Sequence, residues 1–95
     1  MFVSVIKSLF YIPHFKSLKE RRAMILSIKS KLIRNFGLSV AQVEQTDDPK
    51  IFTLGISLVS SDSKTAENII EKVRNFLYIE SGECMQSFDY KIDKW

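Results

Sequence analysis

The chain has 95 residues, of which 45% are hydrophobic and 26% are charged, and its formal net charge is +3. This length suits one core and is too short for two, so we expect a single domain over residues 1–95. The one cysteine excludes an internal disulfide and fits a reducing compartment. No window approaches the roughly 18 apolar residues of a membrane span. We therefore expect no membrane association and a cytoplasmic location.

Residues 2–12 are expected to form the first strand, and both faces of this strand carry apolar residues, which is typical of a central strand. Residues 17–36 are expected to form a long helix with an apolar stripe at three- and four-residue spacing. Ser17 and Glu20 have the spacing of a capping box at the helix start. Gly37 follows the last apolar residue of the stripe, where a left-handed residue commonly ends a helix.

The second half of the chain predicts two strands, a helix and a last strand. Residues 38–45 and 51–60 read as strands joined by a polar turn, and apolar and small polar residues alternate strictly in the second of them. Residues 61–63 offer several N-caps for a helix that reaches about Glu80. Residues 85–92 can form the fourth strand.

The order βαββαβ predicts an α+β fold, the ferredoxin-like sandwich, in which a four-stranded antiparallel sheet carries both helices on one face. Right-handed crossovers place the first and third strands in the centre of that sheet. The open face then carries Val5, Leu9 and Tyr11 of the first strand. Because this surface is too apolar to stay wet, we expect a second copy or another partner to cover part of it.

Charge is distributed unevenly along the chain. Residues 1–37 hold eight basic side chains and one acidic one, a net charge of +7, whereas residues 38–95 hold six basic and ten acidic ones, a net charge of −4. Such an asymmetry suits nucleic acid or a ribonucleoprotein, and it is equally compatible with helices that are merely solvated. Cations are densest at the predicted helix start, where the partial positive charge of the helix end disfavours them.

This cluster is the main functional lead. Arginine grips phosphate with its planar fork and lysine acts as a point charge. A solubilising surface and a site for an acidic protein are the alternatives. The candidate nucleic-acid contacts are Lys16, Lys19, Arg21 and Arg22, with Lys29 and Arg34 as weaker flanking contacts.

Several chemistries are excluded. The loop after the first strand has neither the glycines and arginine of an acylphosphatase nor the two cysteines of a metal chaperone. The third strand lacks the exposed aromatic residues of an RNA-recognition module. The one histidine, His14, has no visible orienting acid or oxyanion donors. We expect no catalytic residue, no metal and no cofactor.

Five segments spread over nearly the whole chain carry a family resemblance. They are Tyr11-Ile12-Pro13, Ser17-Leu18-Lys19-Glu20-Arg21-Arg22, Phe36-Gly37-Leu38-Ser39-Val40-Ala41-Gln42-Val43, Thr53-Leu54-Gly55-Ile56 and Val59-Ser60-Ser61-Asp62. With them the sequence resembles the YlxP-like family of small bacterial proteins, which implies a ferredoxin-like fold and no established activity. Members often lie in gene neighbourhoods of translation initiation and ribosome maturation factors, which implies a link to RNA or the ribosome. The chain departs from the family at Gln42, where an acid is usual.

These features together predict a non-enzymatic, RNA- or ribosome-associated accessory factor that binds phosphate through the basic helix start. The alternative is a protein-interaction module that self-associates as a homodimer through the open face of its sheet.

Overall fold

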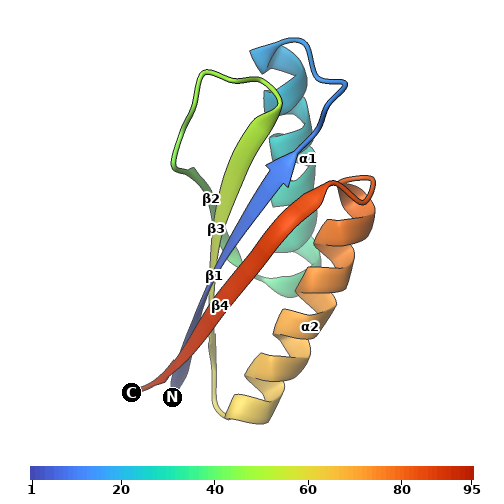
Figure 1. The fold of residues 1–95 in the computed structure, drawn as a ribbon. Helices are drawn as coiled ribbons and strands as arrows, with labels where there is room; N and C mark the ends of the chain where they lie inside the picture. Colours follow the sequence, from blue (N-terminus) through green and yellow to red (C-terminus); the bar gives the residue numbers. More distant parts are fainter.

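The computed structural model describes all 95 residues, and its elements follow the order βαββαβ (Figure 1). Each predicted boundary lies within two residues of the observed one. The second strand is the most shortened, because Glu44 has a positive φ of 51° directly after it. The elements are β1 (Phe2–Tyr11), α1 (Leu18–Phe36), β2 (Ser39–Val43), β3 (Ile51–Ser60), α2 (Ser63–Glu80) and β4 (Met85–Lys94).

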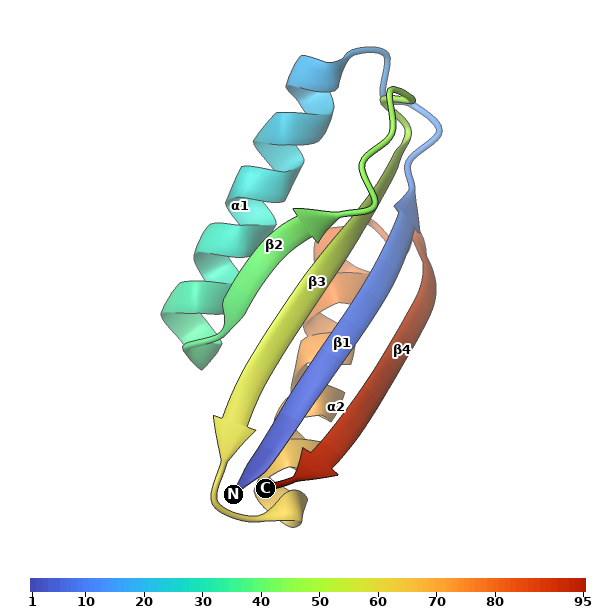
Figure 2. The ribbon, with the colours of Figure 1, turned by 90° about the vertical axis from the view of Figure 1, so that its left-hand side faces the viewer.

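The four strands form one antiparallel sheet in the order β2-β3-β1-β4, so β1 and β3 are central as predicted. The two helices cover one face, and Figure 2 looks onto the face that they leave uncovered. This confirms the ferredoxin-like fold class. Because β2 has only five residues, the chain leaves the sheet early and crosses to β3 through a loop beside the start of α1.

Alternation along β1 separates the core from the open face. Ile6 and Phe10 are buried, and the ring of Phe10 stacks on that of Phe52 in β3 with their centroids 4.7 Å apart. Ser4 and Ser8 are also buried on this side, where small residues leave room for the covering helices. The buried apolar residues of the helices are Ile25, Ile28 and Leu32 in α1, and Ala66, Ile70, Val73 and Leu77 in α2.

Local caps fix where α1 begins and ends. The Oγ of Ser17 accepts a hydrogen bond from the backbone N–H of Glu20 at 3.2 Å, and Oε1 of Glu20 accepts one from the N–H of Lys16 at 3.0 Å. The acidic half of the expected capping box thus reaches one residue further back than usual. At the other end, Gly37 has φ 65° and its N–H bonds to the carbonyl of Ile33. Neither helix is long and apolar enough to cross a membrane.

Helix α2 is capped by a carboxylate, which makes its stability depend on pH. Asp62 accepts hydrogen bonds from the N–H and the Oγ1 of Thr65 at 2.8 and 2.9 Å, and the first of these is the main reason why the pKa of Asp62 lies below its ordinary value. A depressed folded-state pKa stabilises the fold above the unfolded value of about 3.9, and that stabilisation is lost as pH falls through the folded-state pKa.

We expect Asp62→Asn to keep the cap and remove its titration. The difference in unfolding free energy between wild type and variant should shrink as pH falls from about 6 to about 2.5. Urea denaturation at a series of pH values measures this difference. A difference that stays constant over the range would contradict the assignment.

Candidate anion-binding site

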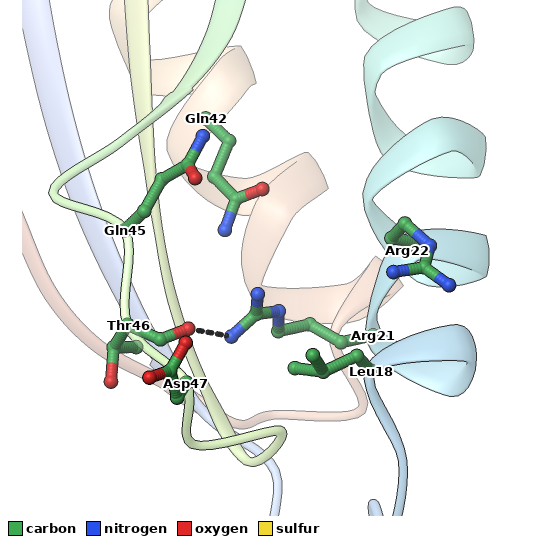
Figure 3. A pocket seen from close by; sticks show the side chains of 7 residues that line it. All are labelled: Leu18, Arg21, Arg22, Gln42, Gln45, Thr46 and Asp47. Carbon is green, nitrogen blue, oxygen red and sulfur yellow. Dashed lines mark hydrogen bonds between the residues drawn. The ribbon is translucent and has the colours of Figure 1, made fainter.

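The start of α1 and the loop between β2 and β3 enclose a pocket of about 660 Å³ (Figure 3). One wall is the first turns of α1 and the other is the end of β2 with the loop that follows. Leucine supplies the one apolar side chain in the lining, so the pocket is a polar site. Its lining residues are Leu18, Arg21, Arg22, Gln42, Gln45, Thr46 and Asp47.

Arg21 lies on the inner face of α1. Taking Leu18 as zero and about 100° per residue, Arg21 falls near 300°, inside the arc of the apolar stripe. The side chain is accordingly buried, with 7% of its surface exposed. Of the four candidate contacts at the helix start, Lys16, Lys19 and Arg22 are exposed, whereas Arg21 is not. The helical position of Arg21 was the signal in the sequence that could have shown this.

The guanidinium of Arg21 holds the loop in place. Its Nη1 donates to the backbone carbonyls of Thr46 at 2.6 Å, Asp48 at 2.9 Å and Ile51 at 3.3 Å. Two of these carbonyls belong to the loop and the third to Ile51 at the start of β3. Hydrogen bonds to a buried guanidinium satisfy polar groups on both partners. Asp48 also accepts from the N–H of Lys50, which tightens the turn. Arg21 therefore joins α1 to the β2–β3 hairpin.

The other edge of the same guanidinium is free. All three hydrogen bonds come from Nη1, and Nε is buried without a partner. The amide Nε2 of Gln42 is also buried without a partner, and Figure 3 shows it turned toward the space in front of Arg21. Buried donors without acceptors are rare in folded proteins. The pocket thus contains unpaired donors from both of its walls.

The candidate cations are not neutralised by carboxylates. The carboxylate of Glu20 is used in capping α1, and Asp47 is the one acid in the pocket lining. Every salt bridge in the structure uses other cations, so none of the six candidate cations is ion-paired. The four salt bridges are Lys7–Glu44, Lys31–Glu80, Arg74–Glu71 and Lys91–Asp93.

The five candidate cations other than Arg21 form two groups along α1. Lys16, Lys19 and Arg22 are exposed around its first turns and make up the first-turn group. Lys29 is half-buried and Arg34 is exposed, and at 1.5 Å per residue they lie about 10 and about 18 Å further along the helix axis than Arg22. The two groups therefore cannot grip one phosphate together. Lys29 and Arg34 border a second hollow with Leu26, Ser30 and Ile33.

The predicted interaction residues Val5, Leu9 and Tyr11 alternate along β1 with the buried core residues, so they lie on the sheet face that the helices leave open, the face seen in Figure 2. Val5 and Tyr11 keep 48% and 41% of their surface exposed, and Leu9, which lies between them on the same face of β1, is half-buried. Lys7 lies between them and donates to Glu44 at 2.7 Å, a bond that raises the pKa of Lys7. The apolar strip of β1 is thus uncovered in the monomer.

The remaining candidates are isolated. His14 is exposed and its ring meets the edge of Phe15, and Cys84 is a half-buried residue packed against the core. No three histidine, cysteine or acidic side chains come together as a metal site would require.

Comparisons with known proteins give a family and a fold. A family model described as a protein of unknown function, DUF503, matches residues 3–90. A comparison with curated protein sequences finds no match. Three solved structures resemble the chain at low identity, so they bear on the fold alone.

The first is the designed protein Foldit4, with a TM-score of 0.57 and 12% identity over 99% of this chain and 97% of that one. The second is a protein from Arabidopsis thaliana, with a TM-score of 0.55 and 12% identity over 98% and 94%. The third is SnoaB, a cofactor-independent oxygenase from Streptomyces nogalater, with a TM-score of 0.53 and 6% identity over 99% and 92%.

We expect Arg21→Met to destabilise the protein by about 3 kcal/mol, because it removes the charged donor that bonds the carbonyls of Thr46, Asp48 and Ile51. Arg22→Met is the matched control, since Arg22 is exposed on the same helix and its loss should cost less than about 0.5 kcal/mol. Urea denaturation compares the two variants. Hydrogen exchange should also become faster in residues 44–51 of Arg21→Met only. Equal stability of the two variants would show that Arg21 does not hold the hairpin.

Proposed function

The chain belongs to the DUF503 family of proteins of unknown function, and we propose that it is a non-enzymatic accessory factor that binds the phosphates of RNA. The first-turn group, Lys16, Lys19 and Arg22, makes the main contact, either with free RNA or with a ribosomal particle. The observation that carries the proposal is that these cations are exposed and have no acidic partner. We further propose that the chain is of the YlxP-like type and acts in the cytoplasm.

Phosphate binding would explain an electrostatic conflict in the sequence. Cations at the start of a helix repel its partial positive charge and one another, so the first-turn group is unfavourable in the free protein. The same helix end attracts phosphate, because its charge and its N–H groups point toward an anion there. A bound phosphate would offset both repulsions, because it attracts the helix end and all three cations. A merely solubilising cluster needs no such position.

The flanking cations favour an extended polyanion over a single phosphate. Lys29 and Arg34 continue along α1 beyond the first-turn group, at about 10 and about 18 Å from Arg22. A strand that follows the helix would meet them in turn. Affinity should therefore rise with RNA length, and Arg21 would add to the contact only through its free edge inside the pocket.

We expect the triple variant Lys16→Gln, Lys19→Gln, Arg22→Gln to bind RNA at least tenfold more weakly than wild type. The loss of three phosphate contacts should also reduce the slope of log affinity against log salt by about 2 for single-stranded RNA. Fluorescence anisotropy with a labelled oligoribonucleotide and co-sedimentation with ribosomal subunits measure these effects.

The matched control is Lys64→Gln, Lys72→Gln, Lys94→Gln, which removes the same charge from three exposed lysines of the second half of the chain. This control should bind nearly as well as wild type. Equal losses in the two triple variants would mean that net charge alone acts. Equal binding by wild type and both variants would end the proposal.

A second function is favoured by the open sheet face. Val5, Tyr11 and Val59 expose 48%, 41% and 64% of their surface on one continuous side of β1 and β3, and exposed apolar strips of this kind mark interaction surfaces. Asp89 and Lys91 of β4 flank the strip with charges of both signs, which is what a self-complementary surface needs. We propose that a second copy of the chain covers this face.

We expect Val5→Lys to convert a dimer into a monomer, because it places a charge in the middle of the apolar strip. Leu26→Lys is the control, since Leu26 is an exposed apolar residue on the outer side of α1. Size-exclusion chromatography with light scattering measures the mass of each protein. A wild type that stays monomeric at high concentration would exclude self-association, as would a dimer that Val5→Lys leaves intact.

A further inference from the structure

We infer that the pocket between α1 and the β2–β3 hairpin is a binding site for a phosphate monoester of nucleotide size. The inference deepens the function proposed above, on which it rests for the positive charge at this end of the molecule. It names a different ligand and different residues, however, and it does not require that long RNA binds along α1.

The fixed orientation of Arg21 is the first argument. Because three backbone carbonyls hold Nη1, the guanidinium cannot rotate, and its Nε–Nη2 edge stays directed away from them. This edge presents two parallel N–H groups, the fork that matches two oxygens of a phosphate or a carboxylate. Nε is buried and has no partner, so neither the protein nor bulk water satisfies it. A charged donor of this kind is costly unless a ligand pairs it.

Gln42 supplies a third donor from the opposite wall. It pairs in register with Leu54, which is fully buried, so its side chain lies on the helix side of the sheet. Its amide nitrogen is buried without a partner and faces the same space as Arg21 (Figure 3). A carboxylate that fills the fork of Arg21 has no third oxygen to offer this donor. A phosphate has further oxygens that can accept from Gln42 as well.

The charge and the volume of the pocket further restrict the class of ligand that it can bind. Arg21 and Arg22 bring two positive charges to the lining and Asp47 brings one negative charge, and a phosphate monoester carries about −1.5 to −2 at pH 7. The volume of about 660 Å³ exceeds that of a phosphate group alone and falls in the range of small-molecule pockets. The pocket therefore has room for an organic group beside a phosphate.

The rest of the lining favours a sugar over an apolar group. Gln45, Thr46 and Asp47 line the loop side of the pocket, and Leu18 is the one apolar residue. A carboxylate such as that of Asp47 accepts hydrogen bonds from ribose hydroxyls in other nucleotide sites. A nucleoside monophosphate fits this combination, either free or as the phosphorylated terminal nucleotide of an RNA.

The test is an NMR titration of the intact protein with adenosine 5′-monophosphate. We expect backbone amide shifts in residues 42–48 and in the first turn of α1 that saturate with ligand. Adenosine, which lacks the phosphate, should bind at least tenfold more weakly. An absence of saturable shifts, or equal binding of adenosine, would overturn the inference.

Substituting Arg21 would destabilise the hairpin that it holds, so the binding test uses two substitutions at Gln42 instead. Gln42→Leu removes the third donor and should weaken binding at least tenfold. Gln42→Glu should abolish binding, because its carboxylate would occupy the fork of Arg21, and it should also raise the unfolding midpoint. Gln86→Leu, at an exposed position of β4, is the matched control and should bind as wild type does.

Binding that neither Gln42 substitution alters would overturn the inference, because the nucleotide would then bind without the proposed third donor. An oligoribonucleotide with a 5′-phosphate, compared with the same RNA bearing a 5′-hydroxyl, distinguishes a terminal nucleotide from a free one. The double variant Lys16→Gln, Lys19→Gln separates the two proposals. This variant should bind long RNA more weakly than wild type and bind the mononucleotide as tightly as wild type. Each proposal can therefore fail while the other stands.

Discussion

The hydrogen bonds from the guanidinium of Arg21 to three backbone carbonyls determine how the start of α1 packs against the β2–β3 hairpin, at the cationic end of the molecule. Residues 44–50 lie between β2 and β3 and belong to neither strand, so the sheet does not hold them. Arg21 reaches across from α1 and donates to the carbonyls of Thr46 and Asp48 in this loop and of Ile51 at the start of β3. The same contact leaves the opposite edge of the guanidinium without a partner, and the pocket exists because the loop is held at this distance from the helix.

The fold could be predicted because its signals are local. Alternation in β3, the cap at Ser17 and the left-handed Gly37 each depend on residues close in sequence, and the order of elements then determined the sheet. The helical position of Arg21 indicates its burial, but its hydrogen-bond partners could not be predicted in the same way. Its partners lie 25 to 30 residues away and are backbone carbonyls, which leave no mark in the identities of the residues that carry them.

The site was therefore only partly predictable. The sequence indicated a basic helix start, and the structure divides those cations by exposure: Lys16, Lys19 and Arg22 face solvent, while Arg21 belongs to the interior. Gln42 carried no signal of its own, because a glutamine on a short edge strand is usually solvated. Its importance comes from the helix packed over it. The open sheet face is on the other side, so self-association there would leave the cationic end accessible in each copy.

The choice of arginine for the buried contact has a consequence for how the site responds to acidity. Arginine side chains in general carry their positive charge throughout the pH range in which proteins fold. A phosphate monoester, in contrast, gains a proton with a pKa of about 6. A pocket with an arginine wall would thus offer the same donors to both ionisation forms of the phosphate that we propose it binds. Such a pocket would bind the dianion and the monoanion with different affinities without a conformational change of its own.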